Sequence, residues 1–113
     1  MNQDRLYILW TNADPVTSKL MVMMYAKNSL KNGWWKEVTV IVWGATVKLL
    51  AENEEIQQEF REAEARGVSF EGCIACAQEL NLVSEMEDLG VKLRKWGPPL
   101  TELIKNGEHL ITV

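Results

Sequence analysis

This 113-residue sequence has only two cysteines and one histidine. It is therefore poor in the residues that form disulfides or bind zinc in small domains. Both cysteines, Cys73 and Cys76, lie in one short segment, whereas a secreted domain held by disulfides spreads its cysteines along the chain. A zinc site needs further ligands, and the single histidine, His109, is distant in sequence. We therefore expect no bound metal, no disulfide framework and a reducing, cytoplasmic environment.

Positive charge and long apolar runs are also scarce. The chain has 12 lysines and arginines against 16 aspartates and glutamates, which gives a net charge of −4. An acidic balance argues against binding to nucleic acid or to an anionic membrane surface. No apolar run approaches the roughly 20 residues that a membrane-spanning helix needs. We expect neither nucleic acid nor a membrane among the partners.

Glycine is missing from Thr11–Asp14, the loop that follows the first apolar run. Loops at this position of α/β proteins often bind a phosphate, and glycines let their backbone amides surround it. The absence of glycine argues against a flavin or dinucleotide, and we expect no cofactor.

What the sequence does contain is an ordinary globular composition, with 47% hydrophobic and 25% charged residues, arranged as alternating strand and helix patterns. Such alternation predicts a single domain over residues 1–113, a three-layer α/β/α sandwich around a mainly parallel five-stranded sheet. The expected strands are 5–10, covered on both faces, then 38–43, 68–72, 90–96 and 109–113. The expected helices are 15–31, 54–66, 73–80 and 97–105, with 45–53 a loop or short helix.

The first expected helix contains seven apolar residues in succession, Leu20–Ala26. Seven consecutive residues point around the whole circumference of a helix, so they cannot all face one sheet. Either a second subunit covers the outer side or the helix is enclosed in the core. We favour a subunit interface and hence a homo-oligomer.

Cys73 stands where the third strand is expected to end and a helix to begin. In open α/β sheets, reactive groups collect at the carboxyl ends of the strands. The free N–H groups of a helix start favour a thiolate, which is the nucleophilic form of cysteine. Gly72 is expected to leave this sulfur accessible, whereas Glu71 is adjacent and no basic residue is nearby. The alternative is a buried, inert cysteine.

Cys76 follows one helical turn after Cys73, so the two sulfurs can face each other. A Cys-x-x-Cys pair in an α/β chain is typical of redox sites, where Cys76 would resolve a persulfide or mixed disulfide on Cys73. The simpler interpretation, which we favour for Cys76, is a small residue that packs like its alanine neighbours.

Other candidates are weaker. His109 opens the last expected strand, where a structural role is more common than catalysis. Three tryptophans end strands and are expected at one edge of the sheet: Trp10, Trp43 and Trp96. They either pack in the core or form the wall of an apolar pocket, and we favour core packing.

The stretch Gly67–Ala77 resembles the DsrE/DsrF-like family, which includes sulfur-relay subunits of the TusD type. In that family a strand opened by Gly-Val ends in a cysteine, and a helix of small residues follows. The order of segments over the whole chain is also similar, including a short helix and strand at the end.

The resemblance implies a small α/β/α domain that assembles into trimers, hexamers or hetero-oligomers and accepts sulfane sulfur as a persulfide on Cys73. It also implies partner proteins that donate and accept sulfur. One departure is that Glu79-Leu80-Asn81 stands where sulfur-relay members have an Arg-Gly turn. The competing hypotheses are a small thiol-disulfide oxidoreductase using Cys73 and Cys76, and a non-enzymatic oligomeric domain.

Overall fold

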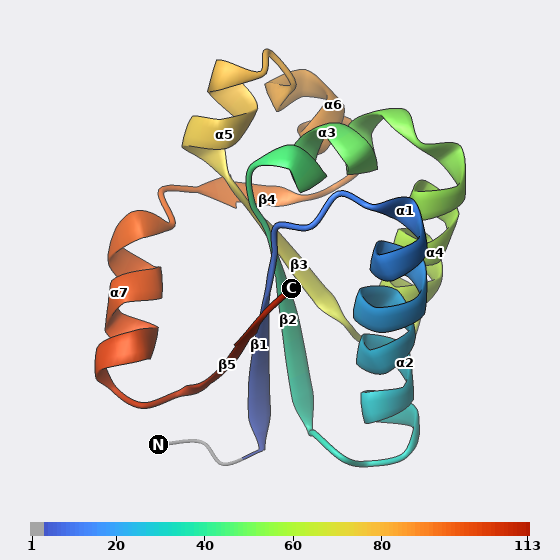
Figure 1. Cartoon of the computed structure of the whole chain (residues 1–113), viewed down its shortest axis with the longest axis vertical. Coiled ribbons are helices and arrows are strands. Elements are labelled where there is room, and N and C mark those ends of the chain that lie inside the picture. Colours follow the sequence, from blue (N-terminus) through green and yellow to red (C-terminus); the bar gives the residue numbers. More distant parts are fainter. Residues whose placement is uncertain (1–3) are drawn as a thin grey trace.

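The computed structural model describes residues 4–113, so residues 1–3 of the predicted domain lie outside the described residues. Five parallel strands form one sheet in the order β4-β3-β2-β1-β5 (Figure 1). The strands are β1 (Arg5–Trp10), β2 (Glu37–Val42), β3 (Ser69–Cys73), β4 (Lys92–Arg94) and β5 (His109–Thr112). The predicted α/β class and five-stranded parallel sheet are confirmed.

The helices lie on both faces of the sheet, but unequally (Figure 1). They are α1 (Pro15–Thr17), the π-helix η1 (Ser18–Met23), α2 (Met24–Lys31), α3 (Ala45–Glu52), α4 (Glu54–Ala65), α5 (Ile74–Glu79), α6 (Val83–Asp88) and α7 (Gly97–Lys105). The chain steps in one direction from β1 to β4 and then returns past β1 to β5. Because parallel crossovers are right-handed, that return places α7 on the face opposite α1, α2 and α4.

Local sequence signals explain where the helices begin. The Asp14 carboxylate accepts a hydrogen bond from the Thr17 backbone N–H at 2.8 Å, and Pro15 takes the first helical position. Asn53 caps α4 in the same way, accepting from the Ile56 N–H at 2.9 Å. Both caps satisfy amides that lack a partner within the helix.

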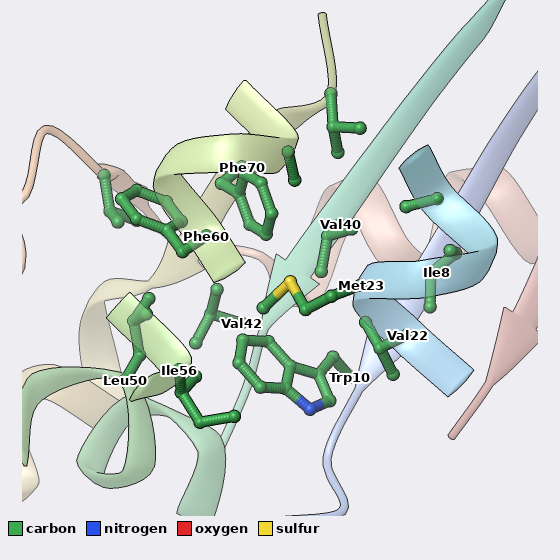
Figure 2. Close-up of a cluster of buried hydrophobic side chains, with 14 of the residues drawn as sticks. Ile8, Trp10, Val22, Met23, Val40, Val42, Leu50, Ile56, Phe60 and Phe70 are labelled. Carbon is green, nitrogen blue, oxygen red and sulfur yellow. The ribbon is translucent and has the colours of Figure 1, made fainter. Parts of the chain in front are cut away.

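The main hydrophobic core lies between the sheet and the helices η1, α2, α3, α4, α5 and α6, and part of it is drawn in Figure 2. Trp10, Met23 and Phe60 are fully buried in it. The Phe60 and Phe70 rings meet edge to face, with their centroids 4.7 Å apart, a favourable aromatic geometry. This core fixes the position of the strand ends on which the candidate site is built.

Two predictions about strands need correction. Strand β1 is not covered on both faces, because Leu6, Ile8 and Trp10 are buried while the residues between them are only half-buried. The reason is that α7 alone covers the second face. The fourth strand is three residues long, Lys92–Arg94, rather than 90–96. It lies at the edge of the sheet, where short strands are common because they limit unwanted pairing.

The apolar run Leu20–Ala26 is not enclosed within this chain. Val22, Met23 and Ala26 are buried, whereas Leu20 is 53% exposed and Met24 is 45% exposed. The fully enclosed helix is therefore the wrong alternative. Within residues 4–113, no helix is long and apolar enough to cross a membrane.

Candidate functional site

Cys73 lies where the sequence predicts it, at the carboxyl edge of the sheet. It is the last residue of β3 and the N-cap of α5. Its Sγ accepts a hydrogen bond from the Cys76 backbone N–H at 3.4 Å. A sulfur in the N-cap position takes the place that an oxygen of serine or aspartate usually fills, so a free amide of the helix points at it.

The expectation that this sulfur is openly accessible is wrong for the single chain, because Cys73 is only 5% exposed. Gly72 does not open a path to it either. A Cβ at Gly72 would lie 2.8 Å from Leu93 Cδ2 and 3.2 Å from Val91 Cγ1, so the glycine lets β4 side chains pack closely over β3. Close packing beside Cys73, rather than exposure, is the reason for a glycine here.

Cys76 is the more accessible of the two cysteines, although it also packs against the hydrophobic core, as the favoured interpretation expects. It is half-buried and lines an open pocket of about 620 Å³ between the start of α3 and α5. The two helices lie at the same end of the sheet (Figure 1). The lining residues are Gly44, Ala45, Lys48, Ala75, Cys76, Glu79 and Leu80.

Burial and hydrogen bonding both shift the pKa of the Cys76 thiol. Burial raises the pKa of Cys76, and its hydrogen bond with the Cys73 sulfur adds to that rise. The Gly44 backbone N–H donates to the Cys76 sulfur and opposes the rise, but the net effect is upward. Both cysteines are free thiols in this structure. At neutral pH Cys76 therefore holds its proton more firmly than an ordinary cysteine.

This raised pKa predicts how Cys76 reacts. Its alkylation by iodoacetamide in the native protein should show a midpoint at higher pH than that of the same cysteine in the unfolded chain. Peptide mass spectrometry after timed labelling across neutral to strongly alkaline pH gives both curves. A native midpoint at or below the unfolded one would contradict the burial argument.

The same shift predicts a loss of stability at alkaline pH. The unfolded chain releases the Cys76 proton first, so the free energy of unfolding should fall as pH rises through the ordinary range of a cysteine. The loss stops once the folded thiol has also ionised. Cys76→Ser should remove this part of the decline, as measured by urea unfolding at a series of pH values.

A basic residue does lie beside the site, although none is near it in sequence. Arg94 of β4 is the register partner of Cys73 in the sheet. Its Nε lies 2.9 Å from Glu71 Oε1, and its guanidinium lies 4.5 Å from the centre of the Trp96 ring. The negative charge of Glu71, adjacent to this site, is therefore paired with Arg94.

The remaining candidates are not part of this site. His109 begins β5 and so lies at the opposite, amino-terminal edge of the parallel sheet, 5.2 Å ring to ring from Trp35. A Cys–His nucleophile pair is thereby excluded. The favoured core role holds for Trp10, which is fully buried in the hydrophobic cluster, and Trp96 is also buried.

The loop after β1 is closed by the end of the chain. The backbone amides of Thr11 and Asn12 both donate to the Val113 carbonyl, at 2.7 and 3.0 Å. Trp43, the third of the strand-end tryptophans, is half-buried and donates its backbone N–H to the Trp10 carbonyl at 3.2 Å. These backbone N–H groups already have partners within the fold, so they are not free to bind a phosphate.

Sequence reasoning missed three residues of the site: Gly44, Lys48 and Arg94. Each comes from an element at least 20 positions away from Cys73, so local spacing could not find them. Of the three, only Gly44 could have been found from the sequence, because a glycine directly after the second buried strand indicates a special backbone conformation. Its φ is indeed positive, at 67°, which favours glycine. Strand order, which local patterns do not encode, brings Arg94 to Cys73.

Comparison with known proteins agrees with the geometry. The sequence profile of the DsrE/DsrF-like family matches residues 5–113. A solved structure of a conserved protein of unknown function from Bacteroides thetaiotaomicron is similar, with 41% sequence identity and a TM-score of 0.94. The similarity covers 97% of this chain and 95% of that one. A search of curated proteins finds no match. The chain therefore belongs to the DsrE/DsrF-like family.

Proposed function

We propose that this protein is a sulfur carrier of the sulfur-relay type and that Cys73 holds the sulfane sulfur as a persulfide. Family membership supports a sulfur-relay role in general. The observation that carries the proposal is the N-cap geometry of Cys73, whose sulfur accepts the Cys76 amide at 3.4 Å beside a second thiol. An amide that donates to sulfur stabilises the negative charge of a thiolate or persulfide.

Loading transfers one sulfur atom without net oxidation. A donor persulfide, R–S–SH, gives its outer sulfur to the Cys73 thiolate; the donor S–S bond breaks, a Cys–S–S bond forms, and R–S⁻ leaves as a thiolate. Delivery to an acceptor thiolate repeats this exchange in the opposite direction. The partners are therefore a sulfur donor and a sulfur acceptor, each presenting a thiol or persulfide.

Cys76 offers a second way to release the sulfur. Its thiolate attacks Cys73 Sγ, the bond to the outer sulfur breaks, and HS⁻ leaves as the two cysteines form a disulfide. The sulfane sulfur is reduced and the cysteine pair is oxidised by two electrons, so an external dithiol must then reduce the pair. Both cysteines have to start as thiols, which fits our proposal of a cytoplasmic location.

Mass spectrometry tests the carrier role directly. Incubation with a persulfide donor should add the mass of one sulfur atom to the intact wild-type protein, and peptide mapping should place that atom on Cys73. A double variant, Cys73→Ser with Cys76→Ser, should gain none. The carrier proposal fails if the wild-type protein gains no sulfur on either cysteine.

The contact between the two thiols favours a second candidate function, a thiol-disulfide oxidoreductase. The Cys76 backbone N–H donates to Cys73 Sγ at 3.4 Å and the Cys73 thiol contributes to the raised pKa of Cys76, so the two side chains are neighbours. This function requires a Cys73–Cys76 disulfide that forms without any sulfur donor and is turned over by a reductant. A protein that small alkylating reagents cannot label in its native state would instead be a non-enzymatic domain.

We also propose that the protein is a homo-oligomer, a trimer or hexamer as the family resemblance implies. The outer side of the first helical segment carries an apolar stripe of Val16, Leu20 and Met24, which are 63%, 53% and 45% exposed. Their spacing of four places them on one helical face, and a second copy of the chain is the proposed cover.

Leu20→Glu should therefore lower the molar mass measured by size-exclusion chromatography with light scattering. Ile104→Glu is the matched control, because Ile104 is 61% exposed on α7, on the other side of the sheet. It should leave the mass unchanged. A wild-type monomer at micromolar concentration, or dissociation by the Ile104 variant alone, would rule out the stripe as the interface.

A further inference from the structure

We infer that Cys76 is the cysteine that receives sulfur from the donor, that the pocket between α3 and α5 takes a small organic persulfide with an apolar body, and that the sulfur then passes inward to Cys73. The inference rests on the proposed carrier function and assigns separate tasks to its two cysteines. It also assigns the class of donor.

The first argument is access. Cys73 is 5% exposed and is not among the residues that line the pocket, whereas Cys76 lines it. An incoming donor must bring its outer sulfur into line with the attacking thiolate, and burial slows that approach at Cys73 compared with Cys76. A donor that enters the pocket therefore meets the Cys76 sulfur before the Cys73 sulfur.

The second argument is the closeness of the two cysteines. The Cys76 backbone N–H donates to Cys73 Sγ at 3.4 Å, and the neighbouring Cys73 thiol contributes to the raised pKa of Cys76. A sulfur atom held on Cys76 thus has the Cys73 sulfur as its neighbour within the protein. Transfer over this contact needs no solvent access to Cys73, which explains how a buried cysteine is loaded.

Each step balances. The Cys76 thiol releases its proton to water, and its thiolate takes the outer sulfur of R–S–SH while R–S⁻ leaves and is protonated. The Cys73 thiol then gives up its proton and its sulfur attacks the outer sulfur on Cys76; the S–S bond to Cys76 breaks, and the leaving Cys76 thiolate takes up a proton to become a thiol again. No oxidant or reductant is consumed. The Gly44 backbone amide lowers the pKa of Cys76 and so favours its thiolate at both steps, although burial outweighs this effect.

The third argument is the chemistry of the pocket. Small or apolar residues, including Ala45, Ala75 and Leu80, make up much of its lining, and its volume of about 620 Å³ lies in the range of small-molecule sites. Lys48 and Glu79 add one charge of each sign. An apolar body should therefore strengthen binding, while opposite net charges on the donor should be tolerated about equally.

Loading kinetics with benzyl hydropersulfide, a small donor with an apolar body, test the assignment. Cys76→Ser should slow the appearance of persulfide on Cys73 by roughly tenfold or more, since the accessible acceptor is lost. In Cys73→Ser the added sulfur should be found on Cys76. Unchanged loading of the Cys76 variant would overturn the inference and leave the carrier function standing, whereas a wild-type protein that gains no sulfur would refute the carrier function itself.

Filling the pocket tests the donor site without touching either cysteine. Ala75 is exposed on α5 and lines the pocket, so Ala75→Phe should slow loading by about three- to tenfold. Ala65→Phe, at an exposed alanine at the end of α4, is the matched control and should load normally. Equal rates for both variants would overturn the assignment of the pocket.

Methanethiosulfonate reagents test the specificity. Relative to their rates with the unfolded chain, the benzyl reagent should modify native Cys76 about three- to tenfold faster than the methyl reagent. The sulfonate and trimethylammonium reagents should differ from each other by no more than about threefold, because the pocket carries both charges. Loading by a persulfide-bearing protein but by no small persulfide would overturn the small-donor class.

Discussion

Replacing Trp10 with alanine should lower the free energy of unfolding by about 3–5 kcal/mol, the usual cost of removing a fully buried large aromatic side chain. Trp10 ends β1 and is 0% exposed, in the middle of the core shown in Figure 2. Its indole Nε1 donates to Ser18 Oγ at 3.0 Å, and Ser18 Oγ donates in turn to the Asn12 carbonyl at 2.9 Å. The substitution therefore opens a cavity and also breaks a buried hydrogen-bond chain.

Urea unfolding followed by circular dichroism measures this loss. Trp34→Ala is the matched control, because Trp34 is 55% exposed and should cost less than about 1 kcal/mol. Domains of this size are stabilised by only about 5–15 kcal/mol, so the Trp10 variant should lose a large share of its stability. Similar losses in the two variants would contradict the assignment of Trp10 to the core.

The sequence predicts most of this core because its signals are local. Ile56, Phe60 and Ala63 follow the helical period, and all three are buried on α4. Asp14 and Asn53 are capping residues whose role depends only on the next three positions. Alternation of strands and helices then leaves few topologies, which is why the parallel sheet could be predicted.

Burial at the site could not be predicted in the same way. The sequence places Cys73 at a strand end but does not give the order of the strands. That order brings Leu93 and Val91 onto Gly72 and sets Arg94 beside Cys73. The accessibility of a sulfur depends on such neighbours, so the sequence did not reveal that Cys73 is the more buried of the two cysteines.

The geometry of the pocket beside Cys76 also depends on a buried threonine at the start of α3. Local sequence pattern does not reveal this role. Thr46 is 0% exposed, and its Oγ1 donates to the Trp10 carbonyl at 2.7 Å while accepting from the Trp43 N–H at 3.1 Å. It thus ties the ends of β1 and β2 to the turn that contains Gly44. The position of the amide that reaches Cys76 depends on this tie.

Thr46→Val should lower the free energy of unfolding by about 1–3 kcal/mol, because an isosteric methyl group leaves the buried Trp10 carbonyl without its hydroxyl partner. It should also change the rate of Cys76 alkylation in the native protein, since Gly44 is no longer held. Thr46→Ser keeps the hydroxyl and should preserve that rate, although it removes a buried methyl group. Urea unfolding and timed iodoacetamide labelling give the two readouts. If valine and serine at this position leave Cys76 equally reactive, Thr46 does not set the geometry of the pocket.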